Sequence, residues 1–259
     1  MGLLVKYRPK TFSDFVGAET RREALGIVRA RIESCKEVVW AGYRHVVCDH
    51  EPIALFAPKG CGKTNGLGRL LMKSCFCTEG ADGGPCGSCK TCLGFDAQID
   101  CGMVYLPVPE YPSRTPTTRQ NDNYFCQVYD GANINAVKID YLIGQIKPSP
   151  EAPNEFIKMH PVCVLLDEAH RLDKPKQNAL LTALHGELFS TVILCVSTVN
   201  IPRLDVGFQR RPYPLHFIQP EYNELRAYAE LIAEKESIKI AEKSAVVDLV
   251  EGVNWIPSN

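Results

Sequence analysis

The sequence has almost no net charge, because 29 lysines and arginines stand against 30 aspartates and glutamates, which leaves −1. A chain without a positive excess has no overall field that could hold a nucleic acid. Any grip on DNA must therefore be local or assembled from several chains.

The sequence also lacks any apolar run of the roughly 18 residues that a membrane helix needs. Residues 1–10 lack the apolar core and the cleavage site of a signal peptide. Internal repeats and low-complexity tracts are absent as well. We therefore expect a cytoplasmic protein whose 259 residues form one large domain or two smaller ones.

Cysteine, by contrast, is abundant, with 12 in the chain. In a reducing compartment, clustered thiols bind metal more often than they form disulfides. Four of them follow the spacing C-x8-C-x2-C-x2-C, namely Cys77, Cys86, Cys89 and Cys92. Four thiolates at this spacing predict a closed, structural zinc site.

An iron–sulfur cluster is the alternative at this site, but Cys92 is followed by Leu93 and lacks the x3-C-P continuation of ferredoxins. Cys75 and Cys101 flank the four, and we interpret both as buried free thiols.

Short apolar runs alternate with segments of helical spacing, which predicts an α/β fold with a parallel sheet covered by helices on both faces. The predicted strands are 52–56, 103–108, 162–166 and 191–197, and the predicted helices 20–34, 66–75 and 175–188. Residues 109–122 are polar and predict a loop. Beyond a boundary near residue 220, only helical patterns follow, at 221–237 and 241–252.

Residues 57–64 differ in one position from the phosphate-binding pattern G-x-x-x-x-G-K-[ST], with Ala57 in place of the first glycine. In such a loop, backbone N–H groups face phosphate, the lysine neutralises the outer phosphates and the hydroxyl holds magnesium. Ala57 precedes Pro58, which favours an extended backbone where alanine is unstrained. A glycine-rich turn that matches by chance is the alternative. We expect a working loop made of Pro58, Lys59, Gly60, Cys61, Gly62, Lys63, Thr64 and Asn65.

Cys61 in this loop has two interpretations. Beside Lys63, at an expected helix N-terminus, its thiol would have a lowered pKa and a raised reactivity. The alternative is a shielded and inert side chain.

Asp167 and Glu168 end the apolar run at 162–166. A parallel strand delivers its last side chains to the sheet edge where the phosphate loop also lies. We expect Asp167 to hold magnesium together with Thr64, and Glu168 to polarise the attacking water. A surface acidic pair at a strand end is the other interpretation.

These motifs occur in a familiar order: residues 5–17, the phosphate loop, the cysteine insert, residues 165–172, residues 178–184, a polar strand end and an arginine near 210. Together they resemble AAA+ clamp-loader ATPases, and in particular the gamma/tau subunit of the bacterial DNA polymerase III clamp loader. The resemblance implies an AAA+ ATPase domain over 1–219, with a zinc module at about 75–101, and a small helical lid over 220–259.

The resemblance also implies the cofactors ATP, Mg2+ and Zn2+. The implied partners are other clamp-loader subunits in an open ring, a sliding clamp and primer–template DNA. By position, the residues near adenine and triphosphate would be Tyr7, Arg8, Val16 and Gly17. Ser197 and Thr198 would form the sensor at the γ-phosphate.

Two further contacts are implied by resemblance. Arg210 would be the arginine finger that reaches the neighbouring subunit's ATP, with Arg211 as a second candidate. In residues 130–140, Asn133, Asn135 and Lys138 would contact a DNA phosphate backbone, although a polar surface helix is the alternative there.

Departures from the family are visible. One extra residue between Thr64 and Arg69 predicts a distorted helix start, and Ser258 stands where the lid usually has an arginine. The lid is expected to be incomplete and the collar absent, through truncation or another mode of assembly. Such a chain would suit a divergent or bacteriophage version of the subunit. Its function would be that of an ATP-driven, DNA-stimulated motor; the alternatives are a non-hydrolysing scaffold subunit and an AAA+ regulator of another DNA transaction.

Overall fold

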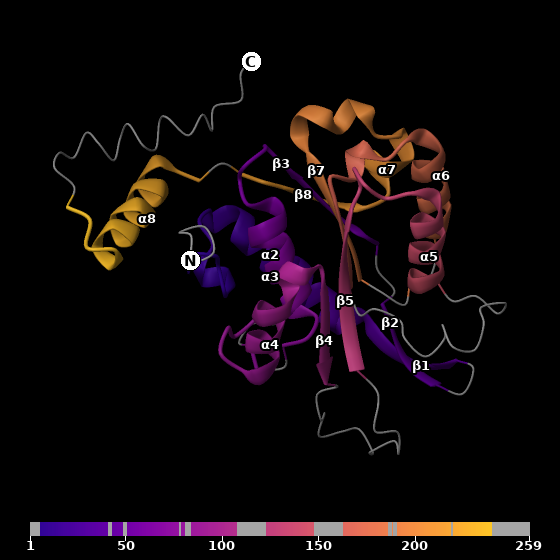
Figure 1. Cartoon of the computed structure of the whole chain (residues 1–259), viewed down its shortest axis with the longest axis horizontal. Helices are drawn as coiled ribbons and strands as arrows, with labels where there is room; N and C mark the ends of the chain where they lie inside the picture. The colour runs from indigo at the N-terminus through magenta and orange to yellow at the C-terminus, as the bar shows by residue number, and fades with distance from the viewer. Residues whose placement is uncertain are drawn as a thin grey trace.

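The structure is a computed structural model, and Figure 1 shows its arrangement. It describes residues 6–40, 43–48, 51–77, 79–80, 84–107, 123–147, 163–185, 188, 191–218 and 220–239. The expected loop at 109–122, the expected helix at 241–252 and Ser258 lie outside these residues.

The centre of the molecule is a six-stranded sheet with the order β4-β5-β6-β7-β3-β8. Its strands are β3 (Ile53–Ala57), β4 (Met103–Pro107), β5 (Asn123–Asp130), β6 (Cys163–Asp167), β7 (Thr191–Ser197) and β8 (Tyr213–His216). All neighbouring pairs are parallel except β4 and β5, which are antiparallel. The predicted strands are thus confirmed, whereas β5 and β8 were not predicted.

Both edge strands contain proline, Pro107 in β4 and Pro214 in β8. Proline lacks the N–H that an inner strand must donate, so within sheets it is tolerated mainly at edges. Pro214 also explains why the sequence of β8 does not look like a strand.

Helices cover both faces of the sheet. Alternate residues of its central strands point to opposite sides, and because these residues are apolar, both faces must be buried. Ile53 and Leu55 of β3 belong to one apolar cluster, and Ala54 and Phe56 to the other. The first cluster includes residues of α2 (Ala18–Ser34) and α3 (Arg69–Ser74), and the second includes residues of α5 (Ala136–Ile146) and α6 (Lys174–Ala183). Figure 1 shows these pairs of helices on opposite sides of the strands. This confirms the predicted α/β class with its parallel sheet, although α6 ends earlier than the predicted residue 188.

The start of the helix after the phosphate loop is distorted, as the extra residue predicted. Lys63–Gly68 form a π-helix, and regular α-helix begins only at Arg69. An inserted residue inside a helix is commonly accommodated by such a wider turn, often at a functional site.

The remaining elements lie around this sheet. They are a separate antiparallel hairpin of β1 (Cys35–Trp40) and β2 (Tyr43–Cys48), which was not predicted, and the helices α4 (Lys90–Gln98), α7 (Val206–Arg210) and α8 (Tyr222–Lys235). Short 3-10 helices occur at Phe12–Asp14, Ile99–Cys101, Ala169–Arg171 and Thr198–Arg203. None of the helices in the described part of the chain is long and apolar enough to cross a membrane.

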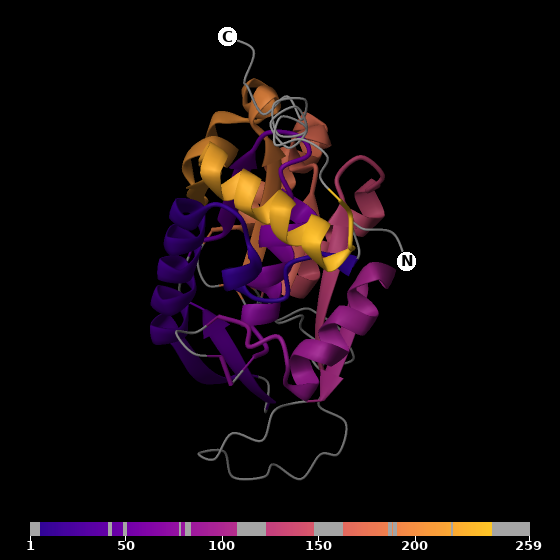
Figure 2. The same cartoon turned by 90° about the vertical axis from the view of Figure 1, so that its left-hand side faces the viewer.

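The helix α8 is the described part of the expected lid. Figure 2 shows it running across the N-terminal segment. Two contacts tie it there: the Tyr228 hydroxyl donates to the carbonyl oxygen of Tyr7 at 3.0 Å, and the Tyr7 hydroxyl donates to Glu236 Oε1 at 2.6 Å.

Candidate nucleotide and metal sites

The phosphate loop begins where β3 ends. Ala57 is the last residue of β3 and pairs with Ser197 of β7, so its backbone is extended, as inferred from Pro58. Gly60 and Gly62 have φ of 88° and 82°, which an L side chain rarely adopts, and nothing lies within 4 Å of where their Cβ atoms would be. The glycines thus stand where the loop needs them, and alanine stands where it is not strained.

Lys63 and Thr64 each contact one of the two predicted carboxylates. Lys63 is only 7% exposed, and its Nζ donates to Glu168 Oε1 at 3.0 Å. The Thr64 hydroxyl donates to Asp167 Oδ1 at 2.6 Å. The structure thus brings together four residues that are separated by about a hundred positions in the chain. Pro58 and Thr64 are half-buried, whereas Lys59, Gly60 and Asn65 are exposed.

The carboxylates lie at the carboxyl end of β6, between β5 and β7. Asp167 Oδ1 also accepts the N–H of Glu168 at 2.9 Å. Glu168 has φ of 49° although it is not glycine, and such a strained backbone is found preferentially at functional sites. Burial opposes ionisation of Glu168 and is the largest single influence on it. The hydrogen bond and charge of Lys63, together with the nearby His170 and Arg171, outweigh burial and hold the pKa of the carboxyl below its ordinary value.

His170 and Asn200 join this group and were missed in the sequence. His170 Nε2 lies 3.2 Å from Glu168 Oε2 and 3.0 Å from Asn200 Nδ2, so the imidazole connects the carboxylate to the segment after β7. The imidazole is buried, and its desolvation lowers the pKa of His170. The signal was available as the histidine two positions after Glu168, but its partner comes from a distant part of the chain.

Ser197 ends β7 beside Ala57, and Thr198 follows it as a half-buried residue. The hydroxyl oxygen of Ser197 is buried and has no hydrogen-bond partner among the described residues. A buried hydroxyl without a partner costs about 1–3 kcal/mol, so a ligand that supplies a partner would be favoured there.

Cys61 does not have the lowered pKa that the helix N-terminus suggested. Burial raises the pKa of its thiol, and this desolvation outweighs the nearby Lys63 and the backbone N–H groups that favour the thiolate. Its Sγ lies 2.9 Å from the carbonyl oxygen of Pro58. Of the two interpretations, the shielded thiol is the one in agreement with the structure.

Four predicted nucleotide residues make contacts outside this group. Tyr7 bonds to α8 as described above, and Arg8 Nη1 donates to Asp100 Oδ1 at 2.9 Å. Val16 is half-buried, and Gly17 has φ of 109° and lines a cavity of about 420 Å3 between the starts of α2 and α8.

The two candidate arginine fingers differ clearly. Arg211 donates through Nη1 to the carbonyl oxygen of Leu181 at 2.9 Å and is therefore occupied within its own chain. Arg210 is exposed at the end of α7 and makes no polar contact with any residue that the structure describes. Its guanidinium is thus available to another molecule.

The predicted DNA-contact residues lie at the start of α5. Asn135 caps this helix by accepting the N–H of Lys138 at 2.9 Å, and Asn133 Nδ2 donates to Asp130 Oδ2 at 2.5 Å. Lys138 is exposed. Part of the hydrogen-bonding capacity of both asparagines is therefore used locally, whereas Lys138 is available.

The four predicted metal ligands form a cluster: the Sγ atoms of Cys77, Cys86, Cys89 and Cys92 all lie within 4.8 Å of one another. Backbone N–H groups point at three of the sulfurs, from Cys86 to Cys77 at 3.3 Å, from Cys89 to Cys86 at 3.2 Å and from Cys92 to Cys89 at 3.3 Å. Such donors stabilise thiolates, and four thiolates at this separation fit a tetrahedral zinc ion.

Ionisation within the cluster is uneven. The hydrogen bond from Cys92 lowers the pKa of Cys77 to about 4, and the same bond raises the pKa of Cys92. Neither Cys75 nor Cys101 belongs to the cluster. The interpretation of both as buried thiols is wrong, because Cys101 is exposed and Cys75 only half-buried.

The residues at the carboxyl ends of β3, β6 and β7 fit a nucleotide with magnesium; we call them the strand-end group. Hydroxyl and carboxylate oxygens are the ligands that Mg2+ takes in phosphate sites, and Thr64 and Asp167 bring one of each together. The remaining requirements of a phosphate site are the open space above Gly60 and Gly62, the ammonium of Lys63 and the Ser197 hydroxyl, which has no partner among the described residues.

The chain is similar in sequence to bacterial DNA polymerase III subunits. The chain is 28% identical over 236 residues to DNA polymerase III subunit tau of Salmonella typhimurium, and equally to that of Escherichia coli. It is 23% identical over 243 residues to subunit tau/gamma of Haemophilus influenzae. These alignments cover 90%, 90% and 93% of this chain. The chain resembles DNA polymerase III subunit tau/gamma.

This tau/gamma-like chain spans less than a third of those relatives, 29%, 29% and 28% of their lengths. No family model matches it. Among solved structures, the Thermotoga maritima RuvB Holliday junction branch migration motor aligns with a TM-score of 0.49 and 16% identity, over 94% of this chain and 59% of that one.

Proposed function

We propose that the chain binds ATP with Mg2+ and hydrolyses it as a motor subunit of a sliding-clamp loader. The observation that carries this proposal is the pairing of Lys63 with Glu168 and of Thr64 with Asp167 at the sheet edge, in a chain similar to subunit tau over 90% of its length. Hydrolysis of ATP would then drive the placement of a clamp on primer–template DNA.

In this proposal each residue has a distinct task. Lys63 binds the outer phosphates, while Thr64 and Asp167 hold magnesium, which neutralises the charge that develops on the phosphates. Glu168 orients the attacking water and accepts its proton. Lys63 holds Glu168 at 3.0 Å in the structure, so its move to a phosphate would release the carboxylate for this task.

The remaining predicted residues complete the proposed site. Ser197 and Thr198 sense the γ-phosphate, and Tyr7, Arg8, Val16 and Gly17 lie on the adenine side. Arg210 reaches the ATP of a neighbouring subunit, for which its exposed and unpaired state among the described residues is the support.

The proposed partners are other clamp-loader subunits in an open ring, a sliding clamp and primer–template DNA, in the cytoplasm. The names of the tau and tau/gamma relatives support membership of such an assembly. Lys138 would contact a DNA phosphate from the exposed start of α5.

The test is ATP turnover by the chain assembled with candidate subunits, with and without primer–template DNA and a clamp. Stimulation by both supports the proposal, and a Lys63→Ala chain serves as the blank. Nucleotide binding without turnover would instead identify the second candidate, a non-hydrolysing scaffold subunit. In the sequence, Ala57 and Ser258 keep this candidate open. Ala57 is unstrained at the end of β3 and so gives it no support, and Ser258 lies outside the described residues.

A further inference from the structure

Lys73 is a buried charge that the proposed ATP chemistry does not use. It lies on α3, directly after the phosphate loop and its π-helix, and is only 1% exposed. Its Nζ pairs with Asp96 Oδ1 at 2.6 Å and donates to the carbonyl oxygen of Lys10 at 3.2 Å. Burying an ammonium costs several kcal/mol unless it is paired and hydrogen-bonded, so these partners are needed.

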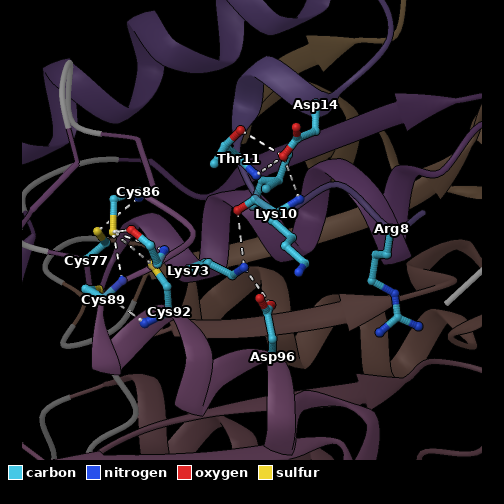
Figure 3. Close-up of polar contacts among 12 residues, drawn as sticks. Arg8, Lys10, Thr11, Asp14, Lys73, Cys77, Cys86, Cys89, Cys92 and Asp96 are labelled. Atoms are coloured by element: carbon cyan, nitrogen blue, oxygen red, sulfur yellow. Dashed lines mark hydrogen bonds and ion pairs between the residues drawn. The ribbon is translucent and has the colours of Figure 1, made fainter. Parts of the chain in front are cut away.

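The three elements that meet at Lys73 come from different functional parts. Asp96 lies on α4, the helix whose first turn contains the metal ligand Cys92. Lys10 belongs to residues 6–17, which we call the opening segment. Figure 3 shows the Lys73 ammonium between Asp96 and Lys10, with the four cysteines close by. One ammonium thus joins the phosphate-loop helix, the cysteine module and the opening segment.

The turn of the cysteine module also packs directly on the opening segment. A Cβ on Gly87, which lies between Cys86 and Cys89, would be 2.9 Å from Thr11 Cγ2. A Cβ on Gly84 would be 2.8 Å from Phe12 Cδ2. These approaches are too close for any larger residue, so the shape of the metal-binding turn sets where residues 11 and 12 can lie.

The opening segment in turn packs on the phosphate loop. A Cβ on Gly66, inside the π-helix that Lys63 begins, would be 3.2 Å from the Phe15 ring and 4.0 Å from Pro9. At its other end the same segment holds α8 through the bonds of Tyr7 with Tyr228 and Glu236. A continuous set of contacts therefore runs from the sulfurs to the nucleotide edge and to α8.

We propose that metal binding at the four cysteines raises the affinity of the nucleotide site by fixing the opening segment, with Lys73 as the positioning residue. The nucleotide part rests on the proposed function; the ordering of the opening segment by metal does not. Coupling between two sites in a protein is typically about 5- to 150-fold, and we expect roughly tenfold here.

The experiment compares the full chain with and without its metal, which a chelator removes and metal analysis counts. Removal should raise amide hydrogen exchange in residues 7–15 and weaken the binding of a fluorescent ATP analogue by roughly tenfold. Turnover at saturating ATP should change little. Because coupling is reciprocal, the analogue should tighten metal binding by the same factor in chelator competition.

Two results would overturn the proposal. One is unchanged exchange in residues 7–15 after metal removal. The other is a loss of protection that extends to β3 and β7, since the metal would then serve the whole fold. If the metal-bound chain binds no ATP analogue, the proposed function fails, and hydrogen exchange decides the effect of metal on the opening segment by itself.

Variants assign the effect to Lys73. Lys73→Met alone would leave Asp96 unpaired, so the test uses Lys73→Met with Asp96→Leu, which replaces the buried pair by apolar side chains and preserves packing. This double variant should bind metal but lose the effect of metal on analogue affinity. Full coupling in the double variant would contradict the proposal. The control is Lys90→Met, an exposed lysine of α4, which should keep the coupling; its loss there would also count against Lys73.

Discussion

Polar groups gather in two regions of the molecule: at the carboxyl ends of β3, β6 and β7, and in the four-cysteine module. The two regions differ in how far these groups are satisfied by their own chain. At the strand ends, the Ser197 hydroxyl is buried without a partner among the described residues, and Glu168 has a strained φ of 49°. In the module, the four sulfurs lie within 4.8 Å of one another, and backbone N–H groups point at three of them.

We interpret the first region as a binding site for a ligand that exchanges, and the second as a site for a structural ion. Unsatisfied or strained groups lower the stability of the fold, and they persist mainly where they contact a substrate or another exchanging ligand. A closed set of four ligands would leave no coordination position for a substrate, so a metal bound there would contribute to folding. Changes at the strand ends should therefore alter rates, and changes in the module should alter local stability.

The largest effect is expected for Arg210, which would act on the strand-end site of a neighbouring subunit. Arg210→Ala should bind ATP almost normally and hydrolyse it about 10³–10⁵ times more slowly, because an arginine finger acts on the transition state. Turnover and equilibrium binding of ATP measure the two quantities.

Mixing shows whether Arg210 acts between subunits. Arg210→Ala and Lys63→Ala chains should each be inactive, and a mixture shown to co-assemble should regain part of the activity. No recovery would mean that Arg210 serves its own subunit or none. Arg203→Ala, an exposed arginine before α7, is the control and should be fully active.

Replacing the strained carboxylate should have the next largest effect. Glu168→Gln should lower turnover by about 10²–10⁴, the usual contribution of a general base, and keep ATP binding. Single-turnover hydrolysis measures the chemical step. If turnover were unchanged, Glu168 would be a surface acid. Glu234→Gln, at an exposed site on α8, is the matched control.

In the module, the expected effect is on folding. Cys89→Ser should abolish binding of one zinc ion per chain and raise hydrogen exchange over residues 84–101, with a far smaller effect on turnover at saturating ATP than Glu168→Gln has. Metal analysis and exchange measure this. Visible absorption typical of an iron–sulfur cluster would contradict the zinc prediction. The control is Cys101→Ser, because Cys101 lies outside the cluster and this variant should still bind metal at the four cysteines.

The smallest effect concerns pH and His170. Burial lowers the pKa of His170 from its ordinary value, so just below about pH 6.5 the unfolded chain binds a proton that the folded chain does not. Stability should therefore fall as pH drops through this window. Denaturant unfolding gives the free energy of unfolding at pH 7 and at pH 5.5. The difference between these two free energies should be smaller for His170→Gln than for the unaltered chain, and equal differences would exclude His170 as the cause.

Much of this molecule follows from the sequence alone. The glycines at 60 and 62, the Lys63-Thr64 pair and the cysteine spacing act through local backbone geometry, and local geometry is written in neighbouring residues. The apolar runs of β3, β6 and β7 are buried on both faces, which makes them legible without any knowledge of their partners. The distortion at Lys63–Gly68 followed from counting residues.

The tertiary structure decided the rest, since it depends on groups that are distant in the chain. Desolvation of Cys61 reversed the direction of pKa shift expected from its neighbours, and burial is not visible in a short motif. Only packing showed that Arg211 is occupied by Leu181 and that His170 meets Asn200. Likewise, Lys73 is an ordinary helix lysine by sequence, and becomes a junction only because Asp96 and Lys10 fold against it.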